Sequence, residues 1–313
     1  MTVTDGTPQS ASGREASTRS RVPAASLWAA ILNFLKFGAN SDPGARHTLF
    51  YRHTLPVRIA HWINAVVIVI MFMSGLQIFN AHPALYWGIT SDFANPVLSM
   101  TGRMVDGAPH GFTQIGPWIF DTTGWLGASQ VNGQWMARGF PSWITLPGQQ
   151  WLAMGRQWHL FFAWFFAING VLFAIYAFVS RHFKRDLLPA MRDIRNIPRE
   201  IADHARLRFH HGQTAKRYNA LQKISYFIVI FLLGPLVVLT GLTMSPTLDS
   251  AFPFLLWIFG GRQSARTIHF LCAFSFFGFF FIHIAMVILA GTWNNIRSMI
   301  TGWFAIEEGG KHG

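Results

Sequence analysis

Four long apolar segments restrict the fold of this chain more than any other feature. They cover about Val57–Phe79, Gln157–Val179, Ser225–Met244 and Thr267–Gly291. Each is long enough to cross a hydrocarbon layer of about 30 Å as a helix. The composition agrees, because 51% of the 313 residues are hydrophobic and only 12% are charged, which is too apolar for an ordinary soluble domain. The sequence therefore predicts an all-α membrane protein, a bundle of four transmembrane helices.

Shorter features complete this prediction. The apolar runs Leu27–Phe37 and Phe252–Phe259 are too short to span and are predicted to be interfacial helices. Pro56 suits the first turn of the first spanning helix. Pro235 interrupts the third, where we expect a kink that neighbouring helices tolerate.

The distribution of Lys and Arg predicts the orientation. Residues 181–218 hold ten basic residues, whereas the long segment 80–155 holds only Arg103 and Arg138. The positive-inside rule therefore places both termini and residues 181–218 in the cytoplasm, and segments 80–155 and 246–266 outside. The net charge of +12 thus follows the topology of a multi-pass protein that contacts lipid, and we expect no nucleic-acid partner.

The chain divides into three predicted parts. Residues 1–45 form a disordered cytoplasmic tail with a short interfacial helix, without a cleavable signal peptide. Residues 46–304 form the membrane domain, and residues 305–313 form a C-terminal tail. Segment 80–155, called the outer segment below, is a long outer loop between the first two spans. It is rich in tryptophan, which suits either an aromatic belt at the membrane interface or a docking platform for an outside partner.

Histidines inside the spans are the candidate functional residues. His269 and His283 lie fourteen residues apart in the fourth segment, about four helical turns and roughly 21 Å of rise, so both imidazoles face one way. The first helix runs outward and the second inward, which puts His61 on the inner side and His159 on the outer side. Matching the depths pairs His61 with His283, and His159 with His269.

Two such pairs, one above the other, suit two haems with bis-histidine ligation, which carry single electrons. The single cysteine, Cys272, excludes an internal disulfide, a four-cysteine iron–sulfur cluster and C-x-x-C-H haem attachment, so the haems would be b-type and non-covalent. Arg262 and Arg266 at the outer face and Arg58 at the inner face are candidate partners for haem propionates. Alternatively, the two outer arginines are plain loop charges. Three glycines within the spans would let a macrocycle approach or simply let helices pack: Gly75, Gly170 and Gly278.

Several stretches resemble the bacterial cytochrome b561-like family, in particular membrane subunits of the thiosulfate reductase cytochrome b type. Those are related to the cytochrome b subunits of nickel–iron hydrogenases and formate dehydrogenases. The resemblance covers roughly residues 47–302, and the stretches that carry it include LPVRIAHWINA, WHLFFAWFFAINGVLFAIYAF, GGRQSARTIHF and FIHIAMVI.

This resemblance implies a four-helix dihaem cytochrome b of the bacterial inner membrane, with iron ligands at His61, His159, His269 and His283. It implies electron transfer between membrane quinone and a periplasmic oxidoreductase, often a molybdenum-cofactor enzyme. The chain would then be an electron-transfer subunit and not a stand-alone catalyst. Two alternatives from other classes are a non-haem membrane anchor and a proton relay or transporter that uses the intramembrane histidines.

Overall fold

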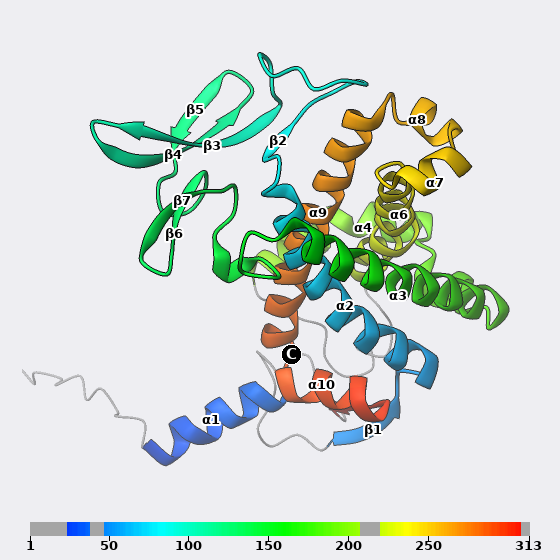
Figure 1. Ribbon diagram of the computed structural model, residues 1–313. Coiled ribbons are helices and arrows are strands. Elements are labelled where there is room, and N and C mark those ends of the chain that lie inside the picture. The colour runs from blue at the N-terminus through cyan, green and yellow to red at the C-terminus, as the bar shows by residue number, and fades with distance from the viewer. Residues whose placement is uncertain (1–23, 38–46, 207–219, 308–313) are drawn as a thin grey trace, which may run out of the picture.

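The computed structural model describes residues 24–37, 47–206 and 220–307 (Figure 1). Most of the predicted N-terminal tail and the end of the C-terminal tail lie outside these residues. Within them, four helices have the length and composition to cross a membrane. They are α2 (Leu55–Phe79), α3 (Leu152–Val179), the run α5–η4–α6 (Ala220–Leu242) and α9 (Arg262–Leu289). The four predicted spans are therefore confirmed.

Proline explains two local features of these helices. Pro56 occupies the first turn of α2, where its missing N–H costs no hydrogen bond. The third span consists of α5 (Ala220–Phe227), a π-helical stretch η4 (Ile228–Leu233) and α6 (Gly234–Leu242). Pro235 lies in the first turn of α6, directly after η4, so the wider π turns accommodate the proline inside the span.

Shorter helices flank the spans. They are α1 (Ala24–Phe37), α4 (Met191–Ala205), α7 (Pro246–Ala251), α8 (Phe254–Ile258) and α10 (Thr292–Thr301), with the short turns η1 (Ser142–Ile144) and η2 (Phe183–Leu187). Acidic side chains fix α4 against α5: Glu200 accepts the backbone N–H groups of Ala220 and Leu221, and Asp193 pairs with Lys223 at 3.1 Å. A carboxylate at the start of a helix is favourable because the first N–H groups have no helical partner.

The outer segment is not an irregular loop, so the all-α prediction is wrong there. It contains β2 (Ala84–Leu85), β3 (Leu98–Val105), β4 (Ala108–Ile115), β5 (Trp118–Asp121), β6 (Ala128–Val131) and β7 (Gln134–Ala137). Strands β2, β3, β4 and β5 form one antiparallel sheet in that order, and β6 pairs with β7. Two tight turns, Asp106-Gly107 and Asn132-Gly133, have positive φ at both residues. Such Asp-Gly and Asn-Gly pairs strongly favour two-residue hairpins.

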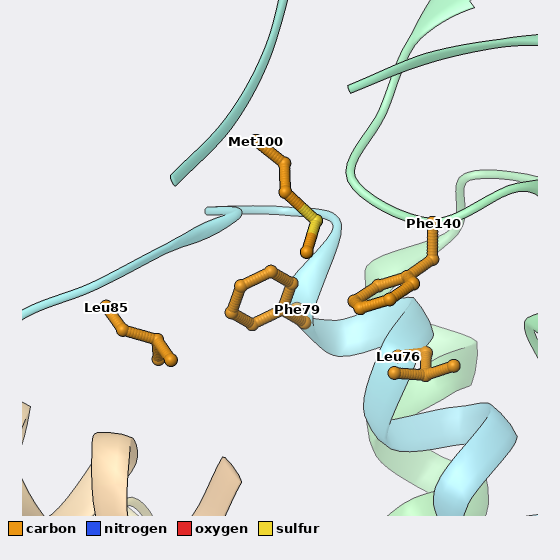
Figure 2. Packing of buried hydrophobic residues seen from close by; sticks show 5 residues of the cluster. All are labelled: Leu76, Phe79, Leu85, Met100 and Phe140. Carbon is orange, nitrogen blue, oxygen red and sulfur yellow. The ribbon is translucent and has the colours of Figure 1, made fainter. Parts of the chain in front are cut away.

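A small apolar core attaches the outer segment to the helices. Leu76 and Phe79 at the end of α2 pack with Leu85, Met100 and Phe140 of the outer segment (Figure 2). The side chain of Asn80 makes two hydrogen bonds to the backbone of Phe140, accepting at 2.6 Å and donating at 3.1 Å. Because both bonds are buried, they hold the chain at Phe140 firmly against the end of α2.

A second small sheet lies at the opposite end of the helices. Strand β1 (His47–Tyr51) pairs antiparallel with β8 (Trp303–Glu307), next to α10. Figure 1 shows β3–β7 at the upper left and α1, α10 and β1 along the bottom, with the long helices between them. Strand β8 extends across the predicted boundary at residue 305.

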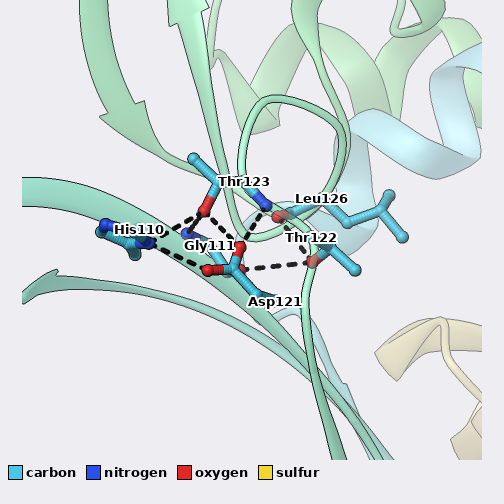
Figure 3. Close-up of polar contacts among 6 residues, drawn as sticks. All are labelled: His110, Gly111, Asp121, Thr122, Thr123 and Leu126. Carbon is cyan, nitrogen blue, oxygen red and sulfur yellow. Dashed lines mark hydrogen bonds and ion pairs between the residues drawn. The ribbon is translucent and has the colours of Figure 1, made fainter.

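A polar cluster closes the bend after β5 (Figure 3). Asp121 accepts hydrogen bonds from the hydroxyl and the backbone N–H of Thr123, and its carboxylate lies 2.9 Å from Nδ1 of His110. These contacts favour the ionised carboxylate. The hydroxyl of Thr123 contributes most, and together they lower the pKa of Asp121 to about 2.

We expect this bend to persist in acid that would protonate an ordinary carboxylate. Because the pKa in the folded state lies below the usual 3.8, ionised Asp121 stabilises the bend above pH 4. This contribution is lost as the pH falls toward 2. Hydrogen exchange of residues 118–124 should therefore be as slow at pH 4 as at pH 6, after correction for intrinsic rates. In Asp121→Asn the bend should exchange faster at both values. Equal exchange in parent and variant would contradict the assignment.

Candidate functional site

The structure brings the four intramembrane histidines together in two pairs. The ring centres of His61 (α2) and His283 (α9) lie 6.1 Å apart, and those of His159 (α3) and His269 (α9) also lie 6.1 Å apart. The interplanar angles are 57° and 64°. These are the pairs predicted from depth and topology. Helix α9 contributes one ring to each pair, so one continuous helix fixes the separation of the two sites.

We call His159 and His269 the outer pair, because they lie toward the outer segment, and His61 and His283 the inner pair. The rings of the outer pair are held by matching contacts. Nδ1 of His159 lies 3.0 Å from the carbonyl oxygen of Met71 and 3.2 Å from the hydroxyl of Ser74, both on α2. Nδ1 of His269 lies 2.9 Å from the carbonyl oxygen of Val237 and 3.2 Å from the hydroxyl of Thr240, both on α6. Each ring therefore meets a carbonyl and a hydroxyl three residues further along one neighbouring helix.

These contacts assign the tautomer of both outer rings. A carbonyl oxygen can only accept a hydrogen bond. The single hydroxyl hydrogen of Ser74 is donated to the carbonyl of Ile70 at 2.7 Å, and that of Thr240 to the carbonyl of Leu236 at 2.7 Å. Both groups near each Nδ1 are thus acceptors, so Nδ1 carries the proton. Nε2 of each ring then has a free lone pair, the form in which imidazole binds a metal.

The separation of the rings fits two axial ligands of one iron. Imidazole nitrogens bind metals at about 2.0–2.1 Å, so the centres of two rings on opposite sides of an iron lie about 6 Å apart. The observed separation of 6.1 Å in both pairs matches this value. Among the described residues, no group of three or more His, Cys, Asp or Glu side chains is arranged to hold a metal ion. Two-ligand sites of this kind suit haem, whose macrocycle supplies the other four ligands.

The inner pair is held differently. His61 meets Trp62 edge-on, with ring centres 5.3 Å apart, and His283 stacks on Phe279 at 5.7 Å. Nδ1 of His61 is buried and has no hydrogen-bond partner among the described residues. Aromatic packing therefore supports the inner rings, whereas hydrogen bonds to backbone carbonyls support the outer rings.

An apolar layer lies between the two pairs. Cys272 and Phe276 are both buried, at spacings of three and seven residues from His269, so they lie on the same side of α9 as the histidines. Phe276 meets Phe166 of α3 edge-on, with ring centres 5.9 Å apart. The region between the two pairs is therefore lined by apolar side chains.

The three candidate arginines have different surroundings. Arg266 donates to the carbonyl of His82 and lies 5.6 Å from the ring centre of Phe79, at the outer end of α9. Arg262 pairs with Asp249 of α7, which satisfies its charge within the loop region. Arg58 lies near Gly302, and its Nε is buried without a hydrogen-bond partner among the described residues. Arg58 and Arg266 are thus better placed than Arg262 to receive an added carboxylate.

The glycines separate into two groups. A Cβ added at Gly75 would lie 3.3 Å from Cε1 of His159, so the missing side chain gives the ring its place. At Gly170 and Gly278 an added Cβ would meet no atom of the described residues within 4 Å.

Sequence reasoning missed Ser74, Thr240 and Gly241 near the outer histidines. A Cβ added at Gly241 would lie 3.3 Å from Cε1 of His269, which repeats the contact of Gly75. The signal was present as a short repeat, Ser-Gly-Leu at 74–76 and Thr-Gly-Leu at 240–242. Sequence reasoning also missed Gln77. This residue is 1% exposed, and its amide has no hydrogen-bond partner among the described residues. Gln77 lies one turn beyond Ser74 and contacts Gly155.

Comparisons with known proteins agree with this geometry. A curated relative from Azospira oryzae, named "Putative protein-methionine-sulfoxide reductase subunit YedZ1", is 25% identical over 233 residues, which cover 74% of this chain and 88% of the relative. No solved structure matches the chain. The sequence profile of a family described as "Prokaryotic cytochrome b561" matches residues 52–302. The chain therefore belongs to the prokaryotic cytochrome b561 family, whose members are membrane electron-transfer proteins with b-type haem.

Proposed function

We propose that this protein is a dihaem cytochrome b subunit that passes electrons between membrane quinone and a periplasmic oxidoreductase. The observation that carries the proposal is the presence of two imidazole pairs, each with ring centres 6.1 Å apart, along one spanning helix. His61 and His283 would hold the inner haem, and His159 and His269 the outer haem. Haems held in this way would carry single electrons.

The protein's own groups would orient and insulate these carriers. The outer imidazoles present Nε2 because their Nδ1 protons are held by backbone carbonyls. Cys272, Phe276 and Phe166 would exclude water between the sites. Arg266 at the outer site and Arg58 at the inner site would hold propionates, with Arg262 as a weaker candidate because Asp249 already pairs with it. The amide of Gln77 would find a polar partner at the outer site.

The partner would dock outside the membrane on the outer segment. Trp118, Ile119 and Phe120 are consecutive exposed apolar side chains of strand β5, and exposed apolar surface of this kind marks interaction sites. The name of the relative describes it as a reductase subunit, which supports an enzyme partner. The cytochrome b subunits that the chain resembles favour a molybdenum-cofactor enzyme as the partner.

The topology would place both termini and the basic segment 181–218 in the cytoplasm of a bacterial inner membrane. Quinone, which dissolves in the bilayer, would exchange electrons at one of the two sites. Lys223, at the inner end of the third span, is a candidate polar contact for quinone, but its ammonium group already pairs with Asp193. It is therefore held in the contact between α4 and α5.

The first test is a reduced-minus-oxidised visible spectrum of the detergent-purified protein, with pyridine haemochrome quantitation. We expect low-spin b-type spectra and two haems per chain. One haem per chain would mean that one of the two histidine pairs does not bind haem. A colourless protein, after expression with adequate haem supply, would contradict the electron-transfer proposal and favour a non-haem anchor or a proton relay. Proton flux into proteoliposomes then separates these two.

A further inference from the structure

The cradle around the outer histidines occurs twice. We define it as a carbonyl at position i, a hydroxyl at i+3 and a glycine at i+4: Met71, Ser74 and Gly75 on α2, and Val237, Thr240 and Gly241 on α6. The distances agree within 0.1 Å in the two copies: 3.0 and 2.9 Å from Nδ1 to the carbonyl, and 3.2 Å from Nδ1 to the hydroxyl in both. An added Cβ would lie 3.3 Å from Cε1 in both copies.

The two copies belong to different helix pairs. His159 of α3 meets its cradle on α2, and His269 of α9 meets its cradle on α6. The two rings of one site are thus held in the same way from opposite sides. Ser74 and Thr240 are both completely buried, so their contacts with Nδ1 are not weakened by bulk solvent.

We propose that Ser74 and Thr240 are positioning residues that fix the orientation of the outer imidazoles and lower the midpoint potential of the outer haem. The inference rests on the proposed function, because it takes His159 and His269 as haem ligands. A hydrogen bond accepted from Nδ1–H makes the imidazole a more basic ligand at Nε2. A more basic ligand stabilises ferric over ferrous iron, so each hydroxyl acceptor makes the potential more negative.

The glycines make this arrangement possible. With a methyl group at position 75 or 241, the ring would have to shift by a few tenths of an ångström. That shift would change the distance from Nδ1 to both acceptors. The glycine and the hydroxyl therefore act on the same ring: the glycine gives the ring space, and the hydroxyl oxygen accepts a hydrogen bond from its Nδ1–H.

Redox titration of the haem-loaded protein tests the proposal. In Ser74→Ala and Thr240→Val we expect full haem content, since the carbonyl bond to Nδ1 remains. One of the two components should shift to a more positive potential, by up to tenfold in the ferric-to-ferrous equilibrium, which is about 59 mV for one electron. The shifting component should be the one that is absent from His159→Ala. The other component serves as an internal control.

Matched variants separate positioning from packing. Ser74→Thr and Thr240→Ser keep the hydroxyl and should keep the parent potential. Ser275→Ala removes a hydroxyl that also bonds to the carbonyl four residues earlier, but at an exposed position of α9. Thr243→Val removes a buried hydroxyl, at the residue directly after α6, that bonds to the carbonyl of Thr240. Neither control should move either component.

The angle between the axial rings gives a second readout. The g-values of a low-spin ferric haem respond to this angle, which is 64° in the outer pair. We expect the electron paramagnetic resonance signal of the outer haem to change in Ser74→Ala and Thr240→Val, and to return in Ser74→Thr and Thr240→Ser. The double variant should combine the two potential shifts, because the hydroxyls act on different rings.

Four outcomes are decisive. Parent-like potentials and g-values in both hydroxyl-free variants would overturn the inference while leaving the dihaem proposal intact. Loss of the outer haem in Ser74→Ala and Ser74→Thr alike would also overturn it, because side-chain volume and not the hydroxyl would then matter. Loss in Ser74→Ala with full recovery in Ser74→Thr would support positioning. A parent protein without haem would instead contradict the proposed function.

Discussion

Replacing His159 with alanine is expected to remove half of the haem from the purified protein. The ring of His159 lies 6.1 Å from that of His269, and a haem that loses one of two axial imidazoles in an apolar bundle loses both iron coordination and orientation. His269→Ala should remove the same half. His61→Ala and His283→Ala should each remove the other half. Pyridine haemochrome quantitation and the reduced spectrum measure the effect directly.

Double variants identify the members of each pair. His159→Ala combined with His269→Ala should lose no more haem than either single variant, because both residues serve one site. His159→Ala combined with His61→Ala should lose all of it. His110→Ala, which changes a histidine of the outer segment (Figure 3), is the control and should retain full haem. A colourless His159→Ala/His269→Ala protein would mean that the pairing is wrong.

Replacing Arg138 with methionine is expected to unfold the outer segment while the spanning helices persist. Arg138 is 2% exposed and donates to the carbonyl of Phe140 at 2.6 Å, the carbonyl of Gly148 at 3.1 Å and the hydroxyl of Thr145 at 3.0 Å. Burial lowers the pKa of this guanidinium, but the three oxygen acceptors stabilise its positive charge. Hydrogen bonds to charged groups contribute about 1.5–3 kcal/mol each, so we expect a destabilisation of about 3 kcal/mol or more.

Limited proteolysis measures this effect. A loss of about 3 kcal/mol raises the population of the open segment about a hundredfold, and cleavage within residues 84–150 should accelerate by a similar factor. Arg103→Met makes the same chemical change at an exposed position of β3 and should leave the cleavage rate close to that of the parent. The spectrum after chemical reduction should be unchanged in both. Equal cleavage rates in the two variants would show that the buried contacts of Arg138 do not hold the segment.

The helices were predictable because a bilayer dictates the length of an apolar run. The structure extends each helix beyond the apolar run at one end or more, as in α3, which begins at Leu152 and not at Gln157. Polar residues such as Arg156 continue a helix once it leaves the hydrocarbon, and hydropathy does not detect this. The pairing of the histidines followed from helix direction and rise alone.

Two features were not predicted, for different reasons. The β-structure of the outer segment had local signals, since Asp106-Gly107 and Asn132-Gly133 are turn sequences. The many tryptophans instead suggested an interface loop. The hydroxyls that accept hydrogen bonds from the outer rings had no such local sequence signal. Ser74 and Thr240 contact His159 and His269, which are 85 and 29 residues away in the chain. Only the packing of α2 on α3 and of α6 on α9 brings them together.

Helix α9 (Arg262–Leu289) sets the separation of the two histidine pairs, because it carries one histidine of each. Fourteen residues return a side chain to nearly the same direction, whereas one residue more or fewer would rotate one imidazole by about 100° away from its partner. Insertion or deletion of one residue between His269 and His283 would therefore separate one histidine from its partner, even where the added residue is apolar. The hairpins of the outer segment are not bound by this rule, because their turns at Asp106-Gly107 and Asn132-Gly133 lie outside the spanning helices. Under the proposed function, the outer segment could therefore change in length without altering the distance between the two histidine pairs.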